Sequence, residues 1–157
     1  MTDDDAKRAE ELDKAIKAAL KADRCDEAIA RAEKLLAFRS RAQGPKHFET
    51  VNAQWLLKTL HRVAPMTHED RVAYASARTM NEQAEALYGQ GKYAKAQPIF
   101  ENALEIRHRL LTDDHPDTAE SYNNVALCLD SQSKHADALP LFKKALTISN
   151  CLIGAKN

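Results

Sequence analysis

The chain has 157 residues, of which 44% are hydrophobic and 29% charged, and its 23 basic and 23 acidic residues give a formal net charge of zero. This composition does not indicate a disordered protein, and the balanced charge argues against a nucleic-acid-binding protein, which needs a concentrated basic face. No uncharged apolar run approaches the roughly 18 residues of a membrane span, and the acidic start does not resemble a signal peptide. We therefore expect a cytoplasmic protein with reduced cysteines.

Glycine and proline are few, alanine is abundant, and the chain-breaking residues divide the sequence into helix-sized segments. Thr67 and Asp70 form an N-terminal cap signal, Gly91 permits a tight turn, and Pro116 suits a first helical turn. No segment alternates like a strand. In chain order, the predicted helices cover residues 4–22, 26–40, 48–63, 67–88, 93–111, 116–131 and 135–153.

The last four predicted helices contain an internal repeat with a period of 42 residues. Residues 84–100 align with residues 126–142, and the apolar pattern continues as far as Ile106 and Ile148. A fixed period of this size is typical of stacked helix hairpins, because each hairpin must cover its neighbour to bury its apolar face.

A weaker copy lies near the start, at an offset of 68 residues from the middle repeat. In this register Arg39 corresponds to Arg107, and residues 44–50 correspond to residues 112–118. The offset exceeds the repeat period by the length of one helix. We therefore expect an inserted helix over 48–63, with an apolar stripe formed by Leu56, Leu57, Leu60 and Val63.

Large, small and aromatic residues recur at fixed positions in the two clear repeats. They are Met80, Gln83, Ala84, Leu87, Ala96, Phe100 and Ala103 in one repeat, and Tyr122, Val125, Ala126, Leu129, Ala138, Phe142 and Ala145 in the next. This pattern resembles the tetratricopeptide repeat, in the 42-residue variety of kinesin light chains. It is also similar to N-terminal regions of bacterial multidomain proteins such as CHAT-type proteases.

The resemblance implies an all-α fold, a right-handed α-solenoid of stacked antiparallel helix hairpins with about seven helices. It predicts a single domain over 1–157, built from a divergent first hairpin (4–40), the inserted helix (48–63), a second repeat (67–111) and a third repeat (116–153). Residues 154–157 stop where another repeat would begin. The last helix is therefore expected to be uncapped, and a homodimer through it is one expectation.

The resemblance also implies binding of a protein or peptide in a concave groove lined by the first helix of each repeat. Asparagine suits such a groove because its amide donates and accepts at once. An alternative is a structural or regulatory N-terminal region of a larger effector, acting by self-association or intramolecular docking. The predicted groove residues are Arg78, Asn81, Glu82, Glu85, Tyr88, Glu120, Asn123, Asn124, Leu127 and Asp130.

The chemically reactive residues form no arrangement that indicates an enzyme. The six histidines make no metal-binding pair one helical turn apart, so we expect neither a metal nor a cofactor. His47 and His115 occupy equivalent positions before a helix, which favours capping. The glycines at 89 and 91 lack the strand-to-helix context of a phosphate loop. The cysteines Cys25, Cys128 and Cys151 are far apart, and none has a base placed by the sequence pattern.

Overall fold

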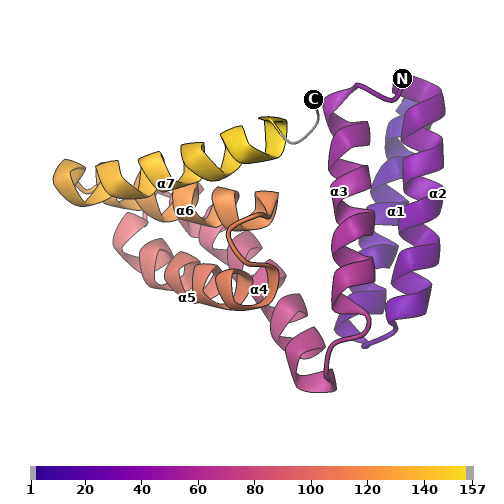
Figure 1. Cartoon of the computed structure of the whole chain (residues 1–157), viewed down its shortest axis with the longest axis horizontal. Coiled ribbons are helices and arrows are strands. Elements are labelled where there is room, and N and C mark those ends of the chain that lie inside the picture. Colours follow the sequence, from indigo (N-terminus) through magenta and orange to yellow (C-terminus); the bar gives the residue numbers. More distant parts are fainter. Residues whose placement is uncertain (1–2, 155–157) are drawn as a thin grey trace. The chain divides into compact units, whose positions relative to one another are not determined.

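A computed structural model describes residues 3–154 of the chain. Within that range the protein contains seven α-helices and no strand, which confirms the predicted fold class (Figure 1). Each predicted helix is present, with boundaries at most three residues from those expected. The helices are α1 (Asp3–Lys21), α2 (Cys25–Gln43), α3 (Phe48–Val63), α4 (His68–Gly89), α5 (Tyr93–Leu111), α6 (Pro116–Asp130) and α7 (His135–Gly154).

The chain divides into two compact units, Met1–Ala75 and Ser76–Asn157. In the first unit α2 packs against both α1 and α3, and in the second unit α6 packs against both α5 and α7 (Figure 1). Helix α4 begins in the first unit and continues into the second. Residues 155–157, at which the sequence suggested a missing repeat, lie outside the described residues.

The second unit has a core in which small side chains occupy the helix crossings. Phe100 of α5 is only 2% exposed and packs in the same cluster as Val125 and Leu129 of α6. Around it, four alanines at equivalent positions of the repeats are almost completely buried, which allows the helix backbones to approach closely. These alanines are Ala84, Ala96, Ala126 and Ala138.

Three hairpin turns, between α1 and α2, α4 and α5, and α6 and α7, share one backbone geometry. Their central residues Asp23, Gly91 and Ser133 have positive φ angles of 54°, 72° and 62°. In each turn the next N–H donates to the carbonyl five residues earlier, as in a Schellman cap. The bonded pairs are Arg24–Ala19, Lys92–Leu87 and Lys134–Leu129, at 2.9 to 3.0 Å.

The connections that lead into α3 and α6 are also built alike. The Nδ1 atom of His47 accepts the backbone N–H of Glu49 at 3.3 Å, and Nδ1 of His115 accepts that of Asp117 at 3.1 Å. Each histidine therefore caps the N-terminus of a helix, as expected from its position in the sequence.

A buried arginine ties α5 to the start of α6. Arg107 is 4% exposed, and its Nη1 donates to the backbone oxygen of Asp117 at 3.1 Å. The same nitrogen lies 2.9 Å from Ser121 Oγ and 3.1 Å from Glu120 Oε2. These three oxygens surround one end of the guanidinium, whereas its buried Nε has no hydrogen-bond partner among the described residues.

Arg39 makes the corresponding link between α2 and α3 in the first unit. Its Nη1 donates to the backbone oxygen of Glu49 at 3.3 Å, and its Nη2 lies 3.1 Å from Asp13 Oδ2. The arginine, the histidine cap and the positive-φ turn thus recur at the same offset of 68 residues in both units.

Asp23 connects the turn between α1 and α2 to the start of α4. Its carboxylate accepts two hydrogen bonds from Arg71, from Nε at 2.6 Å and from Nη2 at 2.9 Å, and lies 2.6 Å from His68 Nδ1. The Arg71 hydrogen bonds, followed by the His68 contact, hold the pKa of Asp23 well below its usual range.

The positive φ angles of Ser133 and Gly91 predict that glycine is favoured at both turns, so that the two reverse substitutions have opposite effects on stability. Ser133→Gly should raise the free energy of unfolding by about 1 kcal/mol, because glycine enters this conformation without steric cost. Gly91→Ser should lower it by about the same amount. A Cβ at Gly91 meets no atom within 4 Å, so the loss would come from the backbone alone. Urea unfolding followed by circular dichroism measures both changes, and equal signs would contradict the assignment.

Replacing Arg107 by methionine should lower the free energy of unfolding by about 2 kcal/mol, because the Asp117 carbonyl and the Ser121 hydroxyl lose a charged donor. Lys95→Met, at an exposed position of the same helix, serves as the control and should change stability by less than about 0.5 kcal/mol. Similar urea midpoints for the two variants would show that the arginine does not hold α6 in place.

The lowered pKa of Asp23 predicts a pH-dependent contribution to stability. The contribution is present above the unfolded-state pKa and is lost as pH falls toward the folded-state value. Asp23→Asn, which keeps a residue that tolerates positive φ, should therefore lower the melting temperature at about pH 6. The difference from the parent protein should shrink toward about pH 3. A difference that stays constant over this range would rule out the charge as its cause.

Candidate functional site

The ten groove residues expected from the sequence all lie in the second unit, on α4 and α6. Four of them, Glu85, Tyr88, Asn124 and Leu127, line one small hollow together with Gly89 and Phe100. We call this hollow the groove pocket. Its volume is about 130 Å³. Small-molecule sites usually measure about 300 to 1,000 Å³, so the groove pocket has room for a side chain rather than for a cofactor.

The groove pocket combines an apolar interior with a polar rim. Phe100, from α5, is buried at 2% exposure, and Tyr88 and Leu127 are half-buried. Glu85 is exposed and Asn124 is half-buried. The sequence pattern identified Phe100 as a core residue of the repeat, but it did not indicate that its ring also borders the groove.

Asn81 does not line the groove pocket but connects two residues that do. It is 6% exposed, and its Nδ2 donates to Glu85 Oε1 at 2.6 Å. Its Oδ1 accepts a hydrogen bond from Asn124 Nδ2 at 3.1 Å. Both ends of the amide are therefore engaged within the protein. Asn81 positions Glu85 and Asn124 in this structure, whereas the sequence pattern suggested that it would face a partner.

The other predicted residues lie on the same two helices without lining the groove pocket: Arg78, Glu82, Glu120, Asn123 and Asp130. The hydroxyl of Tyr88 lies 3.1 Å from Ser131 Oγ, so a hydrogen bond joins the ends of α4 and α6.

Negative charge accumulates beside the groove pocket. Glu120 has a side chain that is 52% exposed, yet partial removal from water raises its pKa above the ordinary value. The adjacent positive charge of Arg107 opposes this shift, whereas the negative charges of Asp117 and Glu85 add to it. The carboxylates of α4 and α6 therefore act on one another through space.

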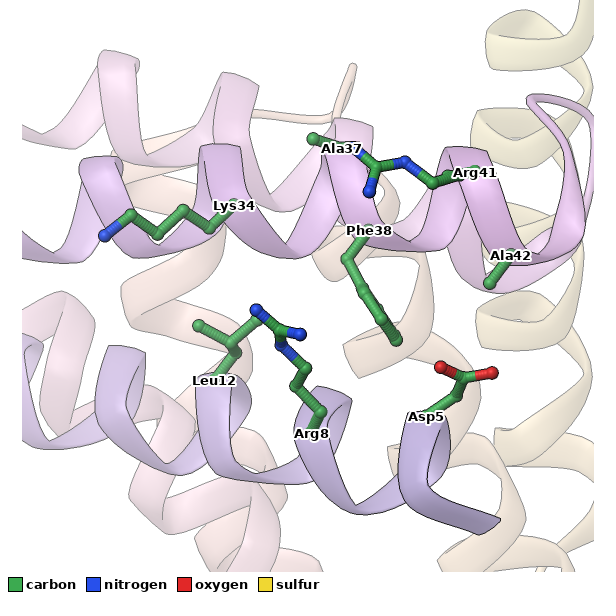
Figure 2. Close-up of a pocket in the computed structure, with 8 residues that line it drawn as sticks. All are labelled: Asp5, Arg8, Leu12, Lys34, Ala37, Phe38, Arg41 and Ala42. Atoms are coloured by element: carbon green, nitrogen blue, oxygen red, sulfur yellow. The ribbon is translucent and has the colours of Figure 1, made fainter. Parts of the chain in front are cut away.

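A second hollow lies between α1 and α2 in the first unit (Figure 2). Its volume is about 560 Å³, and the guanidinium carbon of Arg8 lies 5.7 Å from the ring centroid of Phe38. The sequence pattern gave no indication of this surface, which we call the basic hollow because three of its residues are cationic. It is lined by Asp5, Arg8, Leu12, Lys34, Ala37, Phe38, Arg41 and Ala42.

The described residues offer little for catalysis or metal binding. Cys128 is completely buried, and this burial, followed by the charge of Glu101, raises the pKa of its thiol to about 11. A thiol in this state is a poor nucleophile. Over residues 3–154 no group of three or more histidine, cysteine, aspartate or glutamate side chains could hold a metal ion. In the same range no helix is long and apolar enough to cross a membrane.

The family described as Tetratricopeptide repeat matches residues 75–150, slightly less than half of the chain. No curated protein matches the chain. Repeats of this family mediate protein–protein interactions and are not catalytic. The matched segment contains most of the second unit, including the groove pocket and the Asn81 hydrogen bonds. The match therefore supports a repeat of the tetratricopeptide type within residues 75–150.

Proposed function

We propose that the second unit is a protein-interaction module that binds an extended peptide, or an extended segment of a partner protein, along α4 and α6. One observation carries this proposal. Glu85, Tyr88, Asn124 and Leu127 come from two repeats, and they line a single hollow whose volume suits one side chain.

The groove pocket offers two kinds of contact to such a segment. An apolar side chain of the partner enters between Tyr88, Phe100 and Leu127 and loses contact with water. Asn124 uses one amide hydrogen on Asn81. Its amide can therefore contribute one further donor and its carbonyl oxygen to the partner's backbone. Backbone contacts of this kind supply affinity, while the hollow selects the side chain.

We extend the proposal to the first unit, with residues 4–40 as a divergent hairpin of the same repeat. The shared turn geometry of Asp23 and Gly91 and the matching roles of Arg39 and Arg107 support this interpretation. In the same register α3 (48–63) follows α2 as α6 follows α5. We infer that α3 is the first helix of an incomplete repeat rather than an unrelated insertion.

The repeat length of 42 residues supports the narrower proposal that these repeats are of the kinesin-light-chain type. We also propose that the chain is related to N-terminal regions of bacterial multidomain proteins and, separately, that it is located in the cytoplasm. Identification of the complete reading frame in its genome would test the multidomain context.

A second candidate function is self-association, or docking within a larger polypeptide, through α7. The exposed fractions of Leu139 and Leu146 are 53% and 61%, and the two residues lie two helical turns apart on one face. The equivalent of Leu146 in the preceding repeat, Leu104, is half-buried. Light scattering during size exclusion tests this function, because a monomeric mass at all concentrations would argue against self-association.

Filling the groove pocket should abolish peptide binding without unfolding the protein. Gly89 lines the groove pocket, lacks a positive φ, and a Cβ placed there meets no atom within 4 Å. Peptides would first be selected from a displayed random library on the parent protein. Gly89→Leu should then weaken their binding by at least about tenfold, whereas helicity should remain unchanged.

Gly89→Ala is the matched control, because it changes the backbone preference in the same direction and adds only a methyl group. It should keep the affinity of the selected peptides to within about twofold. If Gly89→Leu and Gly89→Ala bind these peptides equally well, the groove pocket is not the binding site.

A further inference from the structure

The charges around the groove pocket carry an inference about the kind of segment that it accepts. Glu85 lies on the rim, Glu82 lies one turn earlier on α4, and Glu120 lies on α6. All three side chains are exposed. Arg78 is the one cation among the ten predicted groove residues, whereas four of them are acidic, and both Arg78 and Glu82 already interact with other groups of the protein. The groove therefore presents an excess of negative charge to a partner.

The carboxylate of Glu85 is held in place before any partner arrives. Its Oε1 accepts a hydrogen bond from the buried Asn81 amide at 2.6 Å, and the same amide holds Asn124 on the other side of the groove pocket. An ionised carboxylate has about four acceptor sites, so one bond to Asn81 leaves capacity for a cationic donor. A pre-positioned acceptor also loses little conformational entropy when a partner binds.

We propose that the groove of α4 and α6 selects a segment that places an aliphatic side chain in the groove pocket and a lysine or arginine within reach of Glu85 and Glu120. This inference rests on the proposed function, because it specifies the partner of the same groove. The preference for an aliphatic side chain follows from the volume of about 130 Å³ and the apolar interior. The preference for a lysine or arginine follows from the surrounding carboxylates.

The electrostatic state of Glu120 supports a cationic partner. Desolvation and the nearby charges of Glu85 and Asp117 make its ionised form less favourable than in water, although Arg107 on α5 offsets part of this cost. A positive side chain of the partner would lower the pKa of Glu120 again. Binding should therefore release a proton in the pH range in which Glu120 of the unbound protein titrates. The affinity for the partner should increase as pH rises through that range.

The basic hollow of the first unit provides an internal comparison within the same chain. Its lining includes Arg8, Lys34 and Arg41 but only one acidic residue, Asp5. An acidic segment would be attracted to the basic hollow and repelled by the carboxylates of α4 and α6. The sign of the charge that a peptide carries should therefore decide which of the two hollows it binds.

Three peptide libraries bound to the full chain test the proposal. Each consists of capped seven-residue peptides with a central Leu-Arg, Leu-Gln or Leu-Glu pair and randomised flanking positions. The Leu-Arg library should be retained about threefold to fivefold better than the Leu-Gln library, and the Leu-Glu library should be retained least. The differences in retention among the three libraries should decrease as salt is added.

The variant Glu85→Gln with Glu120→Gln should lose this preference while it still retains the Leu-Gln library. Glutamine keeps an acceptor oxygen for Asn81 and for Arg107, so the local hydrogen bonds have substitutes. Glu33→Gln with Glu105→Gln changes the net charge equally at two exposed positions away from the groove pocket, and should keep the preference.

The outcomes separate this inference from the proposed function. If the Leu-Arg and Leu-Gln libraries bind equally and Gly89→Leu blocks both, the groove binds peptides but the charge preference is wrong. A preference for Leu-Glu that disappears in Arg8→Glu would place binding in the basic hollow and overturn the proposal. If no library binds and Gly89→Leu has no effect on selected peptides, the proposed function itself fails.

Discussion

The close approach of helix backbones at buried alanines is the constraint on which the rest of the second unit depends. Ala84 and Ala96 are completely buried, as is Ala126 in the next repeat, so each crossing leaves no room for a larger side chain. Phe100 can then pack within the cluster and also border the groove pocket. The position of the pocket's interior is therefore a consequence of how the repeat packs.

Most of the fold could be predicted from the sequence, because the signals that define it are local. Chain-breaking residues set the helix ends, and the period of 42 residues identifies the hairpins. The common geometry of the three hairpin turns was harder to predict from the sequence. Asp23 and Ser133 have little in common with Gly91 as side chains, yet all three adopt a positive φ. Backbone geometry is retained where residue identity is not, because a Schellman cap requires a conformation rather than a side chain.

The candidate site could be predicted in part. Positions one or two turns apart on a helix share a face, which is why Glu85 and Tyr88 were expected to lie together, and likewise Asn124 and Leu127. The burial of Asn81 could not be predicted, because it depends on Asn124, a side chain 43 residues further along the chain. The basic hollow was missed for a similar reason, since its residues gain proximity only when α1 packs against α2.

Neighbouring residues of one helix have different roles, in packing or in the groove, so the groove can become specific for a partner while the protein keeps its fold. Ala84 and Ala126 are buried and make the helix contacts, whereas Glu85, immediately after Ala84, is exposed on the rim. Asn81 belongs to both groups, because it is buried yet bonds only to rim residues among the hydrogen bonds described for it. Burial of an amide costs free energy unless its hydrogen bonds are satisfied. The burial of Asn81 therefore depends on its bonds to Glu85 and Asn124. A change at Glu82 alters the charge of the groove, whereas a change at Glu85, Asn124 or Glu120 also affects the hydrogen bonds of the buried Asn81 or Arg107.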